Sequence, residues 1–166
     1  MSHPSPKLLP EPFDAVRETE YGYLAVRLDG GAVSALVLSE TCPPVRARPL
    51  LVAVRVLEAV CTYLNDGSTA GLPPLQLQGT AFQRRVWDLL RRIPRGATRT
   101  YGDVARDLGS SARAVGGACR ANPVLILVPC HRVVAKQGAG GFAGRSQGYW
   151  PRVKRQLLAT EGVRLP

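Results

Sequence analysis

The apolar residues of this chain follow two different spacings before residue 65. Residues 21–28 and 32–38 are short runs rich in valine, leucine and tyrosine, and Asp29-Gly30-Gly31 separates them. Two such runs joined by a glycine-containing turn predict a β-hairpin. In Leu50–Leu64 the apolar residues recur every three or four positions, which predicts an amphipathic helix. Residues 1–15 contain four prolines and are expected to form a flexible arm.

Helical spacing continues in the second half of the chain. Thr80 followed by Gln83 matches a capping box and predicts the start of a helix. The segments 101–108 and 112–121 predict two more helices joined by a short turn, which is the helix-turn-helix pattern. A last helix is predicted to begin at Pro151, because proline is favoured at the first helical position.

The most informative segment of the second half is the apolar run 124–128, which has a proline on each side. Such a run predicts a short buried strand. Cys130, His131 and Arg132 follow it directly. We expect this electropositive setting to lower the pKa of the thiol and raise its thiolate fraction, which makes Cys130 a candidate nucleophile. The alternative is a small, buried and inert cysteine.

Charge divides the chain at the proline-containing connection 65–78. Up to residue 78 there are six basic and eight acidic residues, and from residue 79 onward sixteen basic and four acidic residues, which together give the net charge of +10. We therefore predict an N-terminal domain over 1–78 and a C-terminal domain over 79–166. The basic half suggests a polyanionic partner, most often nucleic acid, although a solvated basic surface is the alternative.

Composition narrows the class of protein. The cysteines have no CxxC spacing, and the chain contains two histidines, so it offers poor material for a zinc site. The chain shows no signal-peptide pattern and no apolar stretch of membrane-spanning length. We expect a soluble intracellular protein. The four cysteines suit a reducing compartment and are Cys42, Cys61, Cys119 and Cys130.

Several sequence motifs in the second half occur together in the order found in a known protein family. They are Gly79-Thr80-x-Phe82-Gln83, Ile93-Pro94-x-Gly96, Tyr101-Gly102-x-x-Ala105, Arg113-Ala114-Val115-Gly116 and Pro129-Cys130-His131-Arg132-Val133. This half resembles the O6-alkylguanine-DNA alkyltransferases from Gly79 to Gly162. The resemblance implies an α/β protein, with a small ribonuclease H-like N-terminal sheet-plus-helix domain. The C-terminal domain is then mainly helical and contains the helix-turn-helix.

The resemblance implies four catalytic residues and their roles. Cys130 matches the alkyl acceptor, and His131 matches the histidine that draws the thiol proton through a water molecule. Glu161 matches the glutamate that orients the histidine, which is the nucleophile, base and orienter logic of a triad. Asn122 matches the asparagine that ties the helix-turn-helix to the active-site segment.

Other residues match DNA and base contacts of the family. Tyr101 matches a tyrosine whose hydroxyl contacts the flipped guanine, and Arg113 matches the arginine that fills the gap left in the base stack. The carbonyl groups of Cys130 and Val133 match acceptors of the guanine amino group. The second helix of the helix-turn-helix is slim and matches the one that enters the minor groove. The full set is Tyr101, Arg113, Ala114, Gly116, Arg120, Val133 and Phe142.

The chemistry that this resemblance implies is alkyl transfer from a base oxygen to a thiolate. The product is a thioether without a good leaving group, so we expect one turnover per molecule and no organic cofactor. The substrate is duplex DNA that carries O6-alkylguanine, with O4-alkylthymine as a second lesion, and the base must be flipped out. We expect a monomer in the cytoplasm of a prokaryote or the nucleus of a eukaryote.

Two other functions remain open from the sequence. An alkyltransferase-like damage sensor binds the lesion without reacting, but such relatives lack the acceptor cysteine. A cysteine hydrolase would use Cys130 and His131, but the basic half and the helix-turn-helix disfavour it.

The chain also departs from the family pattern. The span from Tyr101 to Arg113 is about two residues short, Phe142 replaces a tyrosine, and 145–150 is partly extra sequence.

Overall fold

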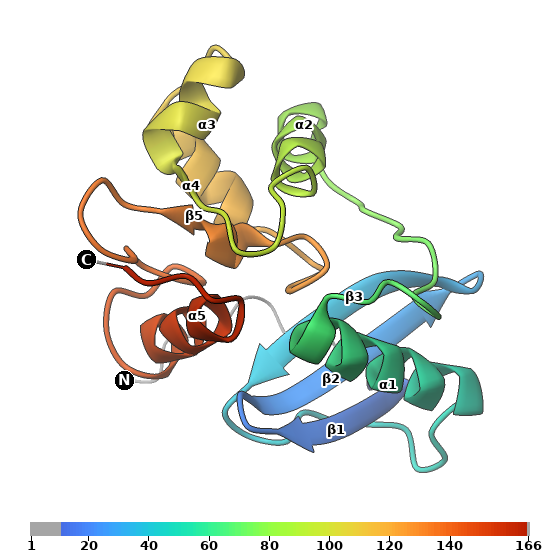
Figure 1. Cartoon of the computed structure of the whole chain (residues 1–166). Coiled ribbons are helices and arrows are strands. Elements are labelled where there is room, and N and C mark those ends of the chain that lie inside the picture. The colour runs from blue at the N-terminus through green and yellow to red at the C-terminus, as the bar shows by residue number, and fades with distance from the viewer. Residues whose placement is uncertain (1–10, 166) are drawn as a thin grey trace, which may run out of the picture.

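The computed structural model describes residues 11–165, which form a sheet with one helix and a group of shorter helices (Figure 1). This confirms the expected α/β class. No helix of that part of the chain has the length and apolarity needed to cross a membrane. The elements in chain order are β1 (Ala15–Thr19), β2 (Gly22–Asp29), β3 (Ala32–Ser39), α1 (Leu51–Asp66), α2 (Ala81–Leu90), β4 (Arg99–Thr100), α3 (Tyr101–Asp107), α4 (Ala112–Arg120), the 3₁₀ turn η1 (Cys130–Arg132), β5 (Val133–Val134) and α5 (Tyr149–Thr160).

The predicted hairpin is confirmed as β2 and β3, which pair antiparallel. Gly30 and Gly31 make the turn with φ angles of 55° and 85°, a backbone region that glycine adopts without steric cost. β1 pairs antiparallel with the other edge of β2. α1 lies across one face of this three-stranded sheet, and the apolar face predicted for Leu50–Leu64 packs against it (Figure 1).

The prediction of a flexible arm over residues 1–15 is wrong for residues 11–15. Residues 1–10 lie outside the part of the chain that the structure describes. Phe13 and Asp14 are both 2% exposed. Asp14 accepts a hydrogen bond from the Leu28 amide at 2.8 Å and pairs with Arg46 at 2.7 Å. Ala15 already belongs to β1. These contacts bind the entry segment to the sheet despite its prolines.

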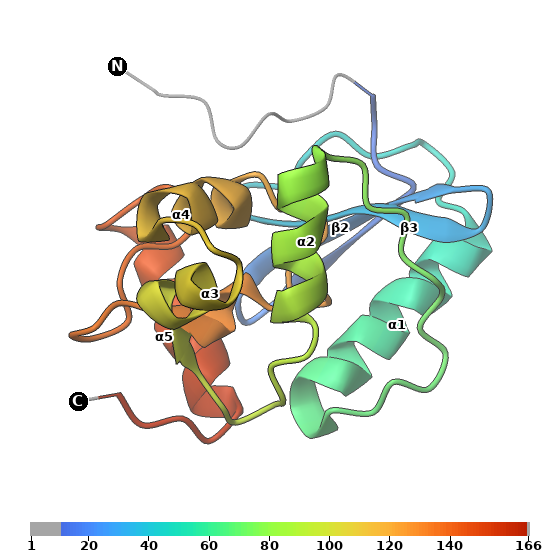
Figure 2. The ribbon, with the colours of Figure 1, turned by 90° about the horizontal axis from the view of Figure 1, so that it is seen from above.

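The predicted capping box opens α2. The Gln83 amide donates to the Thr80 hydroxyl at 3.2 Å, and the Thr80 amide donates to the Gln83 side chain at 2.8 Å. α3 and α4 follow as the predicted helix-turn-helix. The indole of Trp87 in α2 donates to the Ala118 carbonyl of α4 at 2.9 Å. α2 therefore stands between the sheet and the helix-turn-helix and supports α4 from behind (Figure 2).

Two long-range pairings connect the sheet and the helix-turn-helix to the segment around Cys130. The Leu36 amide of β3 donates to the Pro123 carbonyl at 2.9 Å, and the Leu125 amide donates to the Leu36 carbonyl at 2.8 Å. β4, which precedes α3, pairs in parallel with β5. One hydrophobic core also runs through both halves. The division at residue 78 therefore stays a prediction.

The strand predicted for 124–128 is wrong. Val124 forms a single bridge with Leu36, and Leu125 bridges to Val128 across a tight turn. Ile126 has a φ angle of 74° inside this turn. Burial of an apolar run on all sides removes any periodicity from the sequence, so the run could not distinguish a strand from a buried turn.

The last helix begins at Tyr149, two residues before the predicted start at Pro151. Pro151 lies in the first turn, where its missing amide hydrogen is tolerated. The Tyr149 hydroxyl donates to the Tyr21 carbonyl at the β1–β2 turn. This contact anchors the start of α5 to the sheet.

Candidate active site

Asn122 is the second residue after α4 and spans the buried turn that leads to Cys130. Its side-chain amide donates to the Val128 carbonyl at 2.8 Å and to the Cys130 sulfur at 3.3 Å. Its side-chain oxygen accepts from the Val124 amide at 3.0 Å. One buried side chain therefore fixes both ends of the turn and orients the thiol.

Cys130 begins η1 and is 3% exposed. Burial raises the pKa of its thiol, while the hydrogen bond from Asn122 and the charge of Lys154 act in the opposite direction. This corrects the expectation of a lowered pKa from an electropositive setting. Desolvation disfavours the thiolate more than the nearby positive charge favours it, because the sulfur is almost completely buried.

His131 is 1% exposed, and its Nε2 atom lies 2.9 Å from Glu161 Oε1. A carboxylate accepts only, so this nitrogen carries the hydrogen and Nδ1 keeps its lone pair. Nδ1 is buried without a hydrogen-bond partner. Burial lowers the pKa of the imidazole although Glu161 opposes this effect. The ring is therefore neutral and presents an unused basic nitrogen.

Glu161 follows the last residue of α5 and binds two side chains at once. Arg132 donates to Oε2 through Nε at 2.9 Å and to Oε1 at 2.7 Å, which is a bidentate pair. Burial by itself raises the pKa of this carboxyl, but the hydrogen bonds from His131 and Arg132 outweigh it and lower the pKa to about 2. The carboxylate is charged at neutral pH, as an orienter of His131 must be.

Arg132 uses its charge away from the thiol. Besides Glu161, it donates to the Ile93 carbonyl at 2.7 Å and to the Tyr63 hydroxyl of α1 at 2.9 Å. It is 3% exposed, so these partners replace its lost hydration. Arg132 thus locks η1 to α1 and does not supply the positive field that we expected at Cys130.

Lys154 supplies that field, and the sequence interpretation missed it. The residue is 0% exposed, and its ammonium group donates to the Val133 carbonyl at 2.6 Å and to the Gly141 carbonyl at 3.0 Å. Burial lowers its pKa to about 8, and the thiols of Cys119 and Cys130 act in the opposite direction. The available signal was its position on the buried stripe of α5 with Val153 and Leu157, where a lysine is unusual.

A small cavity of about 260 Å³ opens beside Cys130. Tyr101, at the start of α3, and Phe142 line it together with the glycine-rich segment 140–144. The Tyr101 hydroxyl donates weakly to the Gly141 carbonyl at 3.4 Å, and burial raises its pKa. The cavity joins an acceptor sulfur, an aromatic face and a hydroxyl in one space.

The segment around Phe142 contains several glycines and is closed by backbone hydrogen bonds. Phe142 and Arg145 exchange two backbone hydrogen bonds of 2.9 Å, and Ala143 and Gly144 between them have φ angles of 50° and 78°. The Phe142 ring is 4% exposed and meets Trp150 edge to face at 6.0 Å. Phe142 is therefore held against the start of α5.

The outer face of α4 carries the remaining predicted contacts. Arg113 and Arg120 are exposed, and Ala114 and Gly116 lie between them on the helix. A β-carbon placed on Gly116 would meet nothing within 4 Å. This open space rules out tight packing against another helix as the reason for this glycine and leaves α4 slim toward solvent.

The structure thus brings the predicted residues together in two groups. In the first group Asn122 bonds to Cys130, and Glu161 bonds to His131, the next residue along the chain. Tyr101, Val133 and Phe142 lie close to these four residues. The α4 residues lie on the adjoining surface, and Arg120 also lines the small cavity. Within residues 11–165 no group of three or more histidine, cysteine or acidic side chains could hold a metal ion.

Comparison with known proteins points in one direction. The model of the family described as "6-O-methylguanine DNA methyltransferase, DNA binding domain" matches residues 81–163. A methylated-DNA–protein-cysteine methyltransferase of Methanothermobacter thermautotrophicus is 38% identical over 76% of this chain and 68% of its own length. Another, from Saccharolobus islandicus, is 44% identical over 56% of this chain, which spans only 58% of that relative. The crystal structure of Mycobacterium tuberculosis OGT in complex with DNA has a TM-score of 0.70 and 34% identity, and covers 89% of this chain and 91% of that one.

Proposed function

Because this chain belongs to the methylated-DNA–protein-cysteine methyltransferase family, we propose that it repairs O6-alkylguanine in duplex DNA by taking the alkyl group onto Cys130. The single observation that carries the proposal is a pair of buried hydrogen bonds at adjacent residues, one from Asn122 to the sulfur of Cys130 and one between His131 and Glu161. It provides an oriented thiol, a neutral base and a charged orienter within one site. Further support comes from the relative that was crystallised with DNA.

The first step is deprotonation of the thiol. Glu161 fixes the tautomer of His131, so Nδ1 can accept a proton through a bridging water molecule. The charge of Lys154 and the hydrogen bond from Asn122 favour the thiolate that forms. Because burial keeps the thiol protonated at rest, the nucleophile is generated only when the base and the substrate are both in place.

The second step is displacement at the alkyl carbon. The thiolate uses its electron pair to form a carbon–sulfur bond as the carbon–O6 bond breaks. The electron pair of the broken bond stays on guanine, which regains its carbonyl group and takes up one proton on the ring, and this proton balances the one that His131 took from the thiol. The thioether does not release the alkyl group, so each molecule reacts once.

The damage sensor considered above lacks an acceptor cysteine, and the oriented thiol of Cys130 disfavours that function here.

The flipped base occupies the small cavity. Phe142 covers one face of guanine, and base–aromatic stacking of this kind contributes about 1–3 kcal/mol. The Tyr101 hydroxyl and the carbonyls of Cys130 and Val133 complete the recognition. The Val133 carbonyl already accepts from Lys154, but its second lone pair is available for the guanine amino group.

The outer face of α4 contacts the minor groove. Gly116 has open space around it, so the helix can approach the sugar–phosphate edges closely. Arg113 has no hydrogen bond or ion pair within the described part of the chain and is available to fill the gap in the base stack.

The protein acts as a monomer in the compartment that holds the DNA, the cytoplasm of a prokaryote or the nucleus of a eukaryote.

Intact-mass measurement tests this proposal directly. The chain is mixed with excess duplex DNA containing O6-methylguanine, and we expect the mass of one methyl group to be added and no more. Peptide mapping should place it on Cys130. Labelling elsewhere, or methyl release with continued turnover, would refute the proposal.

A second experiment separates DNA recognition from chemistry. Arg113→Ala should slow repair in duplex DNA far more than reaction with free O6-benzylguanine, because a free base does not incur the flipping cost of a few kcal/mol. Arg106→Ala in α3, which is exposed and pairs with Asp103, is the matched control. An equal loss on both substrates would assign Arg113 a structural role.

A further inference from the structure

Arg95, in the connection between α2 and β4, joins the ends of two helices that are far apart in the sequence. Its Nη1 atom donates to the Tyr63 carbonyl of α1 at 3.0 Å. Its Nη2 atom lies within hydrogen-bond distance of three more carbonyls, those of Leu64 at 2.9 Å, Asn65 at 3.1 Å and Thr160 at 3.2 Å. Carbonyls in the last turn of a helix lack most of their amide partners. One guanidinium group therefore caps both α1 and α5.

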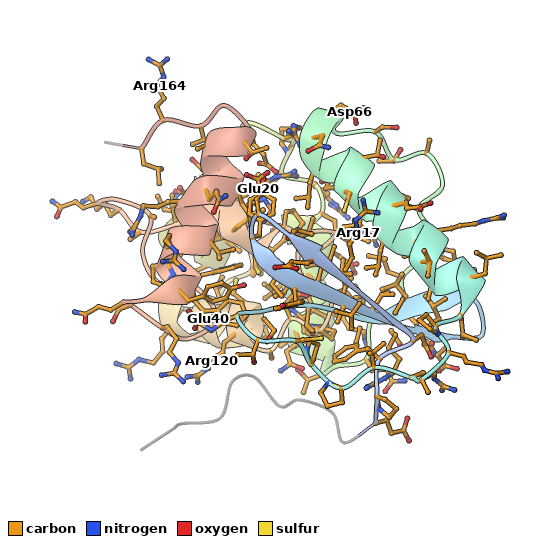
Figure 3. All side chains as sticks on the ribbon, turned by 90° about the horizontal axis from the view of Figure 1, so that it is seen from below. Arg17, Glu20, Glu40, Asp66, Arg120 and Arg164 are labelled. Atoms are coloured by element: carbon orange, nitrogen blue, oxygen red, sulfur yellow. The ribbon has the colours of Figure 1, made fainter. Side chains whose placement is uncertain are left out.

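The junction of these two helix ends lies away from the proposed DNA surface. In Figure 3, Asp66 at the end of α1 and Arg164 after α5 lie toward one end of the molecule, and Arg120 at the end of α4 lies toward the other. The Arg95 side chain passes close to Gly67, where a β-carbon would come within 3.0 Å of its Cδ atom. A substitution at Arg95 therefore leaves the outer face of α4 as it is.

The contact with α5 holds the backbone of Glu161. The Thr160 carbonyl, which accepts from Arg95, belongs to the peptide group that joins Thr160 to Glu161. The carbonyl on the other side of Glu161 lies against the next residue of the connection, because a β-carbon on Gly96 would be 3.2 Å from that oxygen. Residues 95 and 96 thus contact both peptide groups of Glu161.

Tyr63 connects the same junction to the carboxylate of Glu161. Its carbonyl accepts from Arg95, and its hydroxyl accepts from Arg132 at 2.9 Å. Arg132 in turn donates to both carboxylate oxygens of Glu161. Two arginines therefore hold Glu161, one by its backbone and one by its carboxylate, and both bind the same residue of α1.

Glu161 needs such support because of its place in the fold. A carboxylate directly after a helix meets the negative end of the helix dipole, which disfavours it. Its side chain is 5% exposed, and its bond to His131 is 2.9 Å long. A misplacement of about 1 Å in a site of this kind can cost about 10²-fold in rate. The guanidinium group of Arg95 offers positive charge at this helix end and fixes the position of the last peptide group.

We propose that Arg95 is a positioning residue of the alkyl transfer, which acts through Glu161 on the orientation of His131. It touches neither the DNA nor the acceptor sulfur. Through Arg95 and Tyr63, α1 of the sheet half supports the route by which the thiol loses its proton. This inference rests on the proposed function, because the orientation of His131 affects transfer only if His131 draws the proton from Cys130.

A double-mutant cycle tests the inference, because two residues that act through one contact have non-additive effects. Single-turnover methyl transfer from duplex DNA is measured for Arg95→Met, Glu161→Ala and the double variant. We expect Arg95→Met to slow transfer by about tenfold in the unsubstituted chain and by less than about twofold in Glu161→Ala, where no carboxylate is left to position. Arg92→Met, exposed just after α2, is the matched control and should leave the rate unchanged.

Two results of this cycle would overturn the inference. An equal loss in both backgrounds would give Arg95 a general structural role, and an unchanged rate in Arg95→Met would give it none. Should Arg95→Met not fold, Arg95→Lys carries the same cycle, because lysine keeps the charge but lacks the planar fork that reaches several carbonyls. We then expect a loss of about threefold that disappears in Glu161→Ala.

A second measurement does not depend on methyl transfer. In protein with ¹⁵N-labelled histidine, the hydrogen on His131 Nε2 should give a downfield proton resonance, which is assigned by its loss in Glu161→Ala. We expect the resonance to persist in Arg92→Met, to disappear in Arg95→Met and to return in part in Arg95→Lys. Full intensity in Arg95→Met would overturn the inference. Absence of methyl transfer in the unsubstituted chain would overturn the proposed function, while the resonance would still decide whether Arg95 positions Glu161.

Discussion

Two segments, the last turn of α4 and the 3₁₀ turn η1, each present a buried thiol to the same small cavity. Cys119 is 9% exposed and Cys130 is 3% exposed, and burial raises the pKa of both. The positive charge of Lys154 opposes this effect of burial on the pKa of both thiols. Only Cys130 accepts a hydrogen bond from Asn122 and precedes a histidine that is oriented by a carboxylate.

The comparison shows that neither burial nor access to the cavity makes a thiol reactive here. Both cysteines would be inert by those criteria, because desolvation favours the protonated form of each. The difference lies in a route for the proton and a donor that orients the sulfur. Reactivity is a property of the surroundings of Cys130, and each member of those surroundings can be removed separately.

The largest effect is expected from exchanging the acceptor sulfur for oxygen. Cys130→Ser should abolish methyl transfer, because a hydroxyl at this site is a far weaker nucleophile, while binding to duplex DNA should persist. Cys119→Ser is the matched control and should transfer one methyl group per molecule. Intact mass after reaction and a gel-shift titration give both answers. Transfer that survives Cys130→Ser but fails in Cys119→Ser would reverse the comparison.

The second-largest effect is expected from removing the charge of Glu161, which orients His131. Glu161→Gln can still bond to His131, but it no longer selects the tautomer that leaves Nδ1 basic. We expect transfer to slow by about 10²-fold or more, the scale of a lost general base. Glu18→Gln on β1, an exposed glutamate outside the site, serves as the comparison. A single-turnover rate within a few fold of the unsubstituted chain would remove Glu161 from the mechanism.

The same carboxylate should contribute to stability in acid. Its folded-state pKa of about 2 lies below its ordinary value of 4.5, so the stabilisation is present above about pH 4.5 and is lost as the pH falls toward 2. By linkage this amounts to about 3 kcal/mol. The free energy of unfolding, measured by urea titration at several pH values, should fall less steeply with acid in Glu161→Gln than in the unsubstituted chain. Parallel curves would show that the pair contributes nothing.

The smallest effect should follow from Lys154, whose charge acts on both thiols. Lys154→Met should slow transfer by about tenfold at neutral pH, because it removes the positive charge that favours the thiolate of Cys130. In the unsubstituted chain the rate should also level off or fall above a pH of about 8, where the ammonium group loses its proton. Arg155→Met, on the exposed side of α5, should change neither the rate nor the pH profile. An alkaline limb that persists in Lys154→Met would belong to another group.

Local signals in the sequence were sufficient for much of the fold. The hairpin at Gly30-Gly31 and the helix start at Thr80 depend on neighbours within a few residues, and both were found. The turn at 124–128 was mistaken for a strand because its shape is imposed by Asn122 and by β3 from outside. Entry of Phe13 into the sheet is likewise a long-range contact that a proline-rich composition conceals.

The candidate site shows the same division. The residues of the Cys130 signature and Glu161 could be named from the resemblance, but the sign of the thiol pKa shift could not. That sign depends on how completely the fold excludes water, and on Arg132 being turned toward Glu161 and Tyr63. Lys154 was missed because a lysine in a helix is ordinarily solvated, and only the packing of α5 shows that this one is buried.

The two backbone hydrogen bonds between Leu36 and the segment 123–125 also protect the molecule against self-association. They occupy the outer edge of β3, and Leu75 covers the neighbouring part of that edge by a bridge to Val33. An uncovered strand edge is a template for pairing with another chain, which leads to aggregation. A fragment that ends before residue 79 would expose the part of this edge next to Leu36. The helical half of the chain therefore protects the sheet against aggregation, and the same two hydrogen bonds hold the segment that leads to Cys130 in place.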